Sequence, residues 1–511
     1  MREVVDNEFN HYSELHERLA GHGVKSINEE LHINCKQKMD ILYVSTEVAP
    51  FSKAGGLADV VGALPNEISK LGKSTSIITP YYSSVNNAEK SIQYFGISGN
   101  IQIGYDSIDY KLYHYKNESD VDFYFVKNDH YFNRLGIYTD ETGEGFTDNF
   151  ERYLFLQYVV IDLINRGLFS INLIHCNDHH TALIPWMLKN RKINIPTLLT
   201  IHNAEYQGQF SFDEAQLLHP IDFRKRDRRR KIFNSLSLGI KYCDALNTVS
   251  TNYAKELLKK EKLSFGLKKL LIAKKDKFSG IINGVDYTIW NSQTDAILEN
   301  HFSIKSISGK NKNKHALLKK CNWEYSTQPI VGMISRLVIT KGFYLILNSI
   351  DEILATGAKL IILGTGNEKI SLALKKAVKK SPNQISFHNY FDEKMAHIIE
   401  AGSDMFLMPS RYEPCGLNQI YSLRYGTIPI VFNTGGLADT VTDWDGKKGD
   451  GFVFYRYTTK KLVSTIQEAV KMYQDKKTWK KLINNAMNKD YSWSNSAKKY
   501  LNLYTQILEE N

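Results

Sequence analysis

Short apolar runs, several of them β-branched, recur along the chain and alternate with stretches of helical character. The first run, at residues 41–44, is followed by a glycine-containing turn and then by a helix-like stretch that reaches residue 71. The runs in the first half of the chain lie at residues 41–44, 76–79, 121–126, 173–175 and 197–201. This alternation predicts βαβ units and a parallel sheet.

The same pattern restarts in the second half. The predicted strands there lie at residues 330–334, 359–363, 385–388, 405–408 and 429–431. Two doubly wound α/β domains that face each other across a cleft are the simplest architecture. Ligands of such sheets bind beyond the carboxyl ends of the strands, so the cleft is the expected site. We place the boundary within 272–290 and divide the chain into an extension (1–38), two domains (39–275 and 276–490) and a tail (491–511).

One internal echo links the two halves. The segment 55–61 reads GGLADVV, and the segment 435–441 reads GGLADTV. Two similar turns that enter helices would account for the echo. The alternative is that both glycine turns offer backbone N–H groups to one diphosphate at helix N-termini.

Composition sets broad limits on the class of protein. A chain of 511 residues is too long for one ordinary core. Its 42% hydrophobic and 23% charged residues fit a water-soluble protein, and no apolar run reaches the roughly 18–20 residues that cross a membrane. The net charge of +10 allows an anionic partner, either a nucleic acid or a small phosphorylated substrate.

The cysteines indicate a reducing compartment. They are odd in number, form no Cys-x-x-Cys pair, and occur at Cys35, Cys176, Cys243, Cys321 and Cys415. The extension 1–38 has no apolar core for a signal peptide, and its many acidic residues argue against a transit peptide. We therefore expect a cytoplasmic protein, with a plastid as the alternative for a plant or algal source.

Two basic residues follow a predicted strand of the second half. Arg336 and Lys341 are five residues apart and could hold two phosphate oxygens, although a solvated loop also explains them. Glu413 follows the strand at 405–408, where it could meet a ligand or serve as a carboxylate at a helix start. Cleavage of a sugar–diphosphate bond needs both kinds of group, because it leaves negative charge on phosphate and positive charge on the sugar.

Three other polar patterns have simple structural explanations. The run 175–180 (HCNDHH) invites a metal, but adjacent histidines rarely converge on one ion, so contacts to a sugar are favoured. The Asp-x-Asp patterns at 120–122 and 443–445 are interpreted as surface carboxylates, and no metal is predicted. The basic run 224–231 is interpreted as a solvated face rather than a nucleic-acid site, because no nucleic-acid motif accompanies it.

Several long motifs together resemble the bacterial glycogen synthase and plant starch synthase family, from about Met39 to the C-terminus. They lie at residues 45–60 (STEVAPFSKAGGLADV), 200–208 (TIHNAEYQG), 282–286 (INGVD), 408–419 (MPSRYEPCGLNQ), 424–427 (RYGT) and 435–437 (GGL).

The resemblance implies an α/β protein with the GT-B fold, in which a C-terminal helix crosses back to the first domain. It also implies metal-independent, retaining transfer of glucose, usually from ADP-glucose, to the non-reducing end of an α-1,4-glucan, without a cofactor. The partners are then the nucleotide-sugar and the glucan, with no nucleic acid and no membrane; a homo-oligomer is left open.

The resemblance assigns roles residue by residue. It implies catalytic roles for Glu413, His180, Arg336 and Lys341. Donor binding falls to Lys53, Gly55, Gly56, Arg336, Lys341, Phe391, Gly435 and Gly436, the last two through phosphate-facing amides. The cleft around the sugar and acceptor involves Asp59, Asp148, His180, Asn203, Tyr206, Asn234, Cys415 and Gly416.

Three positions depart from the family pattern. Ser237 replaces a usual lysine, Phe391 replaces a tyrosine that stacks on the base, and His179 replaces the tryptophan before His180. Phe391 keeps the aromatic ring and loses the hydroxyl. These changes leave open a related transferase that uses UDP-glucose, or an inactive glucan-binding homologue. For an active enzyme, we favour front-face attack in which the leaving phosphate accepts the acceptor's proton.

Overall fold

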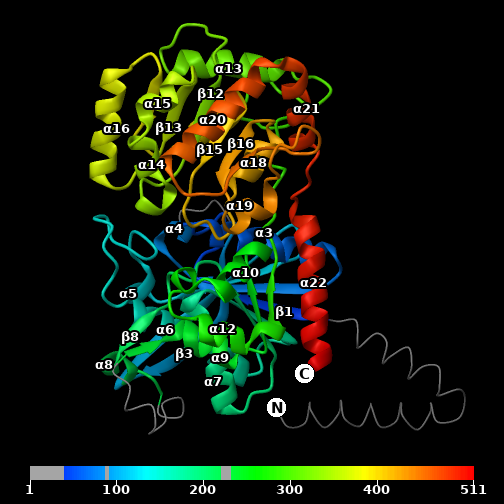
Figure 1. Cartoon of the computed structure of the whole chain (residues 1–511). Coiled ribbons are helices and arrows are strands. Elements are labelled where there is room, and N and C mark those ends of the chain that lie inside the picture. The colour runs from blue at the N-terminus through cyan, green and yellow to red at the C-terminus, as the bar shows by residue number, and fades with distance from the viewer. Residues whose placement is uncertain (1–38, 87–90, 220–231) are drawn as a thin grey trace, which may run out of the picture.

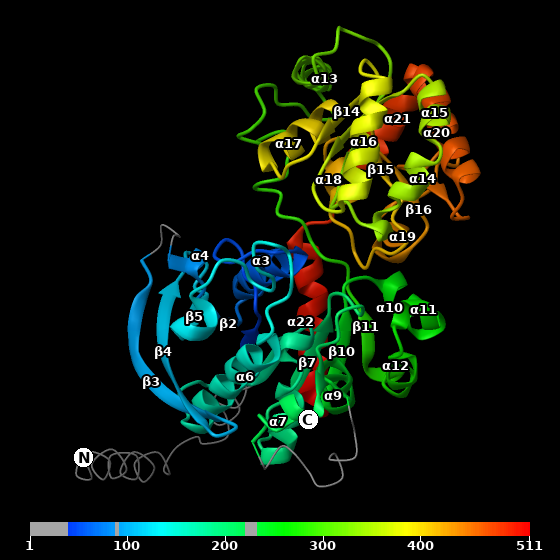
Figure 2. The ribbon, with the colours of Figure 1, turned by 90° about the vertical axis from the view of Figure 1, so that its left-hand side faces the viewer.

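The computed structural model describes residues 39–86, 91–219 and 232–511. The predicted extension 1–38 and the basic run 224–231 lie outside the described residues. Figure 1 shows two α/β domains, one above the other, with the end of the chain running down beside the lower domain. Figure 2 shows the same two domains from the side. The predicted pair of doubly wound domains is therefore confirmed.

The first domain is built on a sheet of nine strands in the order β11-β10-β7-β6-β1-β2-β5-β4-β3. Its strands are β1 (Asp40–Val44), β2 (Ser74–Pro80), β3 (Gln93–Ile103), β4 (Asp106–Lys116), β5 (Asp122–Lys127), β6 (Leu173–Asn177), β7 (Thr197–Ile201), β10 (Ala245–Thr248) and β11 (Phe278–Gly280). A small hairpin of β8 (Gln209–Ser211) and β9 (Ile232–Asn234) lies apart from this sheet.

The predicted parallel pairing holds from β11 to β5 and fails at the edge formed by β4 and β3. The strands β3 and β4 pair antiparallel with each other, and β4 pairs antiparallel with β5. Most side chains of β3 are exposed, so its sequence carries no continuous apolar run. A strand that is solvated on one face alternates between apolar and polar residues, so a continuous apolar run does not mark it.

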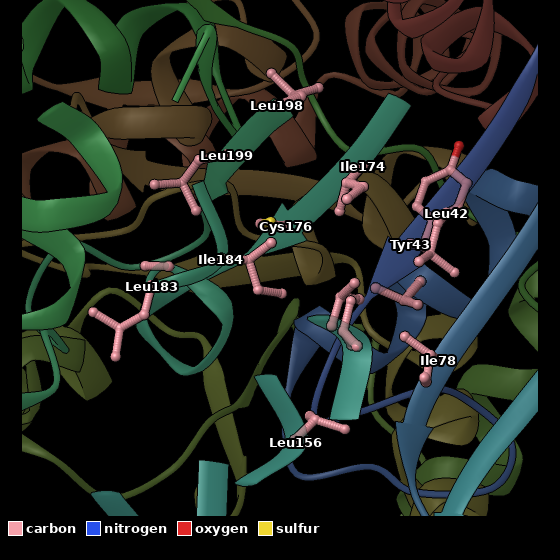
Figure 3. Close-up of a cluster of buried hydrophobic side chains, with 14 of the residues drawn as sticks. Leu42, Tyr43, Ile78, Leu156, Ile174, Cys176, Leu183, Ile184, Leu198 and Leu199 are labelled. Carbon is pink, nitrogen blue, oxygen red and sulfur yellow. The ribbon is translucent and has the colours of Figure 1, made fainter. Parts of the chain in front are cut away.

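Helices cover both faces of this sheet. They are α3 (Gly56–Lys70), α4 (Ser83–Asn86), α5 (Asp129–Phe132), α6 (Asn149–Asn165), α7 (Ile184–Arg191), α8 (Phe212–Ala215), α9 (Ser235–Tyr242), α10 (Thr251–Lys259), α11 (Glu261–Ser264) and α12 (Lys268–Ala273), with short 3₁₀ turns at His179–Thr181 and Lys275–Lys277. Figure 3 shows Leu42, Ile174 and Leu198 of three central strands packed in the core with Leu156 of α6 and Ile184 of α7. Burial on both faces explains why these strands read as continuous apolar runs.

The second domain has a six-stranded sheet in the order β14-β13-β12-β15-β16-β17, and all its pairings are parallel. Its strands are β12 (Ile330–Ile334), β13 (Lys359–Leu363), β14 (Ile385–His388), β15 (Met405–Met408), β16 (Ile428–Phe432) and β17 (Phe452–Phe454). Its helices are α13 (Ser308–Lys320), α14 (Phe343–Leu347), α15 (Ile350–Ala355), α16 (Glu368–Lys380), α17 (Glu393–Gly402), α18 (Asn418–Arg424), α19 (Gly435–Thr440), α20 (Thr459–Gln474) and α21 (Lys476–Met487), with a 3₁₀ turn at Ile339–Lys341.

The first sheet ends at residue 280, which is past the division drawn at residue 275 and inside the predicted boundary region 272–290. Strand β11 pairs in parallel with β10, so residues 278–280 complete the first sheet. Its three residues are only partly buried, and such a short edge strand gives a weak apolar signal. The crossing to the second domain therefore begins after β11.

The last helix, α22 (Trp493–Glu510), crosses back to the first domain as expected (Figures 1 and 2). Its buried face, which includes Trp493, Tyr500 and Tyr504, joins the core of the first domain. The hydroxyl of Tyr504 lies 2.9 Å from Nδ1 of His175 and 3.0 Å from the hydroxyl of Tyr43. The tail thus acts as a structural part of the first domain.

We predict that stability falls in acid partly through His175. Burial lowers the pKa of His175 to about 3, whereas in the unfolded chain it titrates at its usual 6.5. Below pH 6.5, His175 therefore binds a proton in the unfolded state but stays neutral in the native state. The free energy of unfolding decreases as the pH falls toward 3. Between pH 7 and 5 this one group should cost about 2 kcal/mol.

The measurement is the free energy of unfolding from urea titrations at both pH values. His175→Gln should lose about 2 kcal/mol less than the parent protein across this interval. The other buried histidines are present in both proteins, so the difference isolates His175. Equal losses would contradict the prediction.

Within the residues that the structure describes, no helix combines the length and the apolarity needed to cross a bilayer.

Candidate active site

A cleft of about 1310 Å³ lies between the two domains and takes residues from both. It lies at the carboxyl ends of β1, β6 and β7 in the first domain and of β12 and β15 in the second. The predicted site residues that line it are Lys53, Gly55, Gly56, His180, Asn203, Tyr206, Arg336, Lys341, Glu413, Cys415 and Gly416. The basic residues of the second domain therefore share one cleft with the glycine turn of the first.

The second domain contributes a cationic and acidic cluster. Lys341 ends the 3₁₀ turn after β12, and its Nζ lies 2.5 Å from Oε2 of Glu413 in the loop after β15. The hydroxyl of Ser410 donates to the same carboxylate oxygen at 3.0 Å. The exposed side chain of Arg336 makes no hydrogen bond or ion pair with any residue that the structure describes. Its guanidinium is thus available to a ligand.

The first domain contributes the turn between β1 and α3. Nζ of Lys53 is paired with Asp59 at 2.7 Å. The amides of Ala54 and Gly55 donate to Oε2 of Glu47 at 2.6 and 2.8 Å. The amide of Gly55 is therefore bonded within the protein, and its contact with the donor diphosphate stays a prediction. The amide of Gly56 at the start of α3 has no partner among the described residues, so it can still meet an anion.

Glu47 is a cleft residue to which the sequence analysis gave no role. Its side chain is almost fully buried, with 3% of the residue exposed, and its other oxygen accepts a hydrogen bond from the hydroxyl of Tyr138 at 2.6 Å. Glu47 lies three residues after the end of β1, and this position beyond a strand end is the signal that could have identified it as a cleft residue. The carboxylate joins the glycine turn to the wall that holds His180.

His180 is held by ring packing. Its ring lies parallel to Tyr138, with centroids 4.7 Å apart and planes at 18°, and meets the edge of Tyr153. Burial, with a smaller contribution from the charges of His179 and Arg152, lowers the pKa of His180 well below its usual value. Its Nδ1 has no partner among the described residues. The cleft therefore presents a neutral imidazole.

The side chains of the run 175–180 have separate protein partners in the structure. His175 is fully buried between Tyr504 and Thr200. Asp178 accepts a hydrogen bond from the amide of His202 at 2.7 Å, and burial raises its pKa to about 7. No group of three His, Cys, Asp or Glu residues that could hold a metal ion occurs in the part of the chain that the structure describes.

The amides of the second glycine turn are both bonded to protein atoms, so their predicted contact with phosphate stays a prediction. The amide of Gly435 donates to Glu256 of the first domain at 3.0 Å, and the amide of Gly436 donates to the carbonyl of Glu413 at 3.1 Å. A Cβ atom on Gly436 would lie 2.1 Å from the carbonyl oxygen of Cys415. Glycine is required here because α19 packs directly on the backbone of the loop that carries Glu413.

Four further predicted residues do not line the cleft. Asp148 is paired with Arg134 at 2.8 Å, and its neighbours Thr147 and Asn149 line the wall instead. Asp59 is held by Lys53. The side chain of Asn234 caps α9 by accepting from the amide of Ser237, which explains its position without a substrate.

Phe391 is the fourth, with 88% of the residue exposed just before α17. The loop that carries it follows β14, so it begins at the carboxyl edge of the second sheet. The ring does not line the cleft, and its stacking on a base stays a prediction.

The Asp-x-Asp patterns have local roles. Asp445 accepts amides of the turn at 447–449, and Asp443 accepts the amide of Val453. Asp122 lies 2.8 Å from His114, and Asp120 lies 2.8 Å from Lys116. These carboxylates serve turns and a strand pair on the surface.

Two Rossmann-like domains around one cleft, with basic residues of the second opposite a glycine turn of the first, define a glycosyltransferase of the GT-B type. The family described as a starch synthase catalytic domain matches residues 40–273, and the family of group 1 glycosyl transferases matches residues 317–489. The chain belongs to the glycogen and starch synthase family.

Individual relatives agree with this assignment. A glycogen synthase of Geotalea daltonii is 39% identical over 486 residues, which cover 92% of this chain and 99% of that protein. A glycogen synthase of Alkaliphilus metalliredigens is 36% identical over 484 residues, or 92% of this chain and all of that one. The catalytic domain of starch synthase IV from Arabidopsis thaliana, solved with ADP and acarbose, has a TM-score of 0.84 and 29% identity and covers 92% of this chain and 100% of that domain.

Proposed function

We propose that this protein transfers glucose from ADP-glucose to the non-reducing end of an α-1,4-glucan and retains the α-configuration. The observation that carries this proposal is the placement of Arg336 and Lys341 across one cleft from Lys53 and Gly56. In this proposal a diphosphate binds between them, with its sugar directed toward Glu413 and His180. The Arabidopsis relative was solved with ADP and acarbose, and the bound ADP supports an adenine nucleotide as the donor's nucleotide here.

In the proposed mechanism, Arg336 and Lys341 stabilise the negative charge that builds up on the departing phosphate. This effect grows as the bond breaks, so it lowers the barrier rather than only improving binding. The leaving phosphate oxygen accepts the proton of the attacking glucan hydroxyl on the same face of the sugar. The new glycosidic bond therefore keeps the original configuration.

The polar groups on the sugar side have a different task. Glu413 is held by Lys341 and Ser410, so its carboxylate is fixed in place to contact the donor glucose. The neutral ring of His180 offers a hydrogen bond without adding a positive charge that would oppose an oxocarbenium-like transition state. We propose that side chains and backbone amides supply the charge stabilisation, with no metal or cofactor.

Further parts of the proposal concern partners and location. We infer that the nucleotide-sugar and the glucan are the ligands, and that neither nucleic acid nor a membrane takes part. We also place the reaction in the cytoplasm. The four described cysteines, Cys176, Cys243, Cys321 and Cys415, carry free thiols, as expected in a reducing compartment.

The donor is tested with purified protein, glycogen and labelled ADP-glucose or UDP-glucose in parallel, with and without a chelator. We expect kcat/KM for ADP-glucose to exceed that for UDP-glucose by at least about tenfold, the effect of roughly 1.4 kcal/mol in transition-state binding. We also expect the chelator to leave the rate unchanged and proton NMR to show α-linkages in the product.

A UDP-glucose enzyme is the second candidate, favoured by the exposed Phe391 where the family usually has tyrosine. Equal or faster transfer from UDP-glucose would overturn the ADP-glucose assignment in its favour. Incorporation from neither donor would show an inactive glucan-binding homologue.

A further inference from the structure

Tyr412 belongs to the second domain by sequence but to the first domain by packing. It immediately precedes Glu413, and only 7% of the residue is exposed. Its ring is part of the first domain's hydrophobic core, where it meets the edges of Tyr253 and Phe265 with centroids 5.6 and 5.7 Å apart. The loop that carries Glu413 is therefore anchored in the opposite domain through this side chain.

The hydroxyl of Tyr412 enters a chain of hydrogen bonds that has one consistent direction. The amide of Ala204 donates to the hydroxyl oxygen of Tyr253 at 3.1 Å. The hydroxyl of Tyr253 then donates to the oxygen of Tyr412. The hydroxyl of Tyr412 donates in turn to Oδ1 of Asn203 at 2.9 Å. Such a chain is cooperative and fixes each member's orientation.

The chain decides which end of the Asn203 amide faces the cleft. Oδ1 of Asn203 also accepts from the amide of Glu205 at 3.0 Å, so two donors occupy this oxygen. Nδ2 must therefore point the other way, and it has no partner among the described residues, although Asn203 lines the cleft. This arrangement presents an N–H donor to a sugar hydroxyl.

We propose that Tyr412 is a positioning residue that couples the two walls of the cleft. Its hydroxyl holds Asn203 of the first domain in register with the adjacent Glu413 of the second. Asn203 then donates through Nδ2 to a hydroxyl of the glucose unit being transferred or extended. This inference rests on the proposed glucosyl transfer and adds to it a residue that does not itself touch the substrate.

The test compares Tyr412→Phe with the parent protein. Phenylalanine keeps the ring in the core and removes only the hydroxyl, so the fold should be preserved. The matched control is Tyr491→Phe, which removes a hydroxyl that donates to the carbonyl of Thr440 at 2.9 Å and makes no contact with Asn203. Both variants are also combined with Asn203→Ala to complete a double-mutant cycle.

We expect Tyr412→Phe to lower kcat/KM for the glucan about tenfold, the cost of roughly one hydrogen bond in the transition state, while Tyr491→Phe stays within about twofold. In the Asn203→Ala background, Tyr412→Phe should add almost nothing. Parent-like kinetics of Tyr412→Phe, or a full tenfold loss in the Asn203→Ala background, would overturn the proposal.

A second measurement does not depend on turnover. Because the hydrogen bonds of Ala204 and Glu205 belong to this chain, Tyr412→Phe should speed hydrogen exchange at these two amides at least about threefold, and Tyr491→Phe should not. If the parent protein transfers no glucose, the proposed function fails while exchange still decides the role of Tyr412. Unchanged exchange at both amides would refute the coupling.

Discussion

Replacing Lys341 with alanine should lower kcat about 10³-fold while the protein stays folded. Nζ of Lys341 lies 2.5 Å from Oε2 of Glu413, and the side chain lines the cleft together with Arg336. Its charge is worth most when the phosphate departs, so its loss should appear mainly in kcat and only weakly in the KM for the nucleotide-sugar. The measurement is the steady-state rate of glucose incorporation into glycogen.

Two controls separate this role from a structural one. Lys375→Ala removes an exposed lysine on α16, away from the cleft, and should leave the rate unchanged. Far-UV circular dichroism of Lys341→Ala should match that of the parent, which excludes loss of the fold as the cause of the lower rate. A kcat of Lys341→Ala within tenfold of the parent would remove Lys341 from the phosphate-binding role.

Replacing Trp493 with alanine should lower the free energy of unfolding by about 3–5 kcal/mol. Trp493 begins α22 and is 5% exposed, and it packs so closely on residue 284 that a Cβ on Gly284 would lie 2.4 Å from its Cα atom. Its removal leaves a cavity where the tail enters the core of the first domain. The measurement is a urea titration in which unfolding is monitored by the helical circular dichroism signal.

The control for this variant lies on the same helix. Lys498→Ala changes an exposed position of α22 and should stay within about 0.5 kcal/mol of the parent. A loss of less than about 1 kcal/mol in Trp493→Ala would show that the packing of the tail contributes little to the stability of the first domain.

Much of the fold could be predicted because parallel strands are buried on both faces. The apolar runs at residues 330–334 and 405–408, for example, coincide with β12 and β15. The strands β3 and β4 were not predicted because one face of their hairpin is solvated. Strand β11 was not predicted because it is a short edge strand. In each case the missing signal was continuous burial.

The candidate site was likewise predicted only in part. The strand pattern placed Arg336, Lys341 and Glu413 after the ends of strands, and the structure brings all three to one cleft. The resemblance gave them catalytic roles. It also assigned Gly435 and Gly436 to phosphate, whereas their amides bond to Glu256 and to the Glu413 backbone. The same pair of glycines in a sequence can allow close approach of a ligand or close packing of a neighbouring loop, and the sequence does not distinguish the two.

The sequence by itself determined the two α/β halves, the family and the residue types that meet a sugar diphosphate, because hydrophobic periodicity and motif spacing are local properties of the chain. Only the tertiary structure decided which groups are free for a ligand. Glu47 occupies the amide of Gly55, Asp59 holds Lys53, and Tyr412 reaches across the cleft to Asn203. Such partners are set by how distant segments pack, and hydrogen-bond donors and acceptors are shared out only once these segments meet.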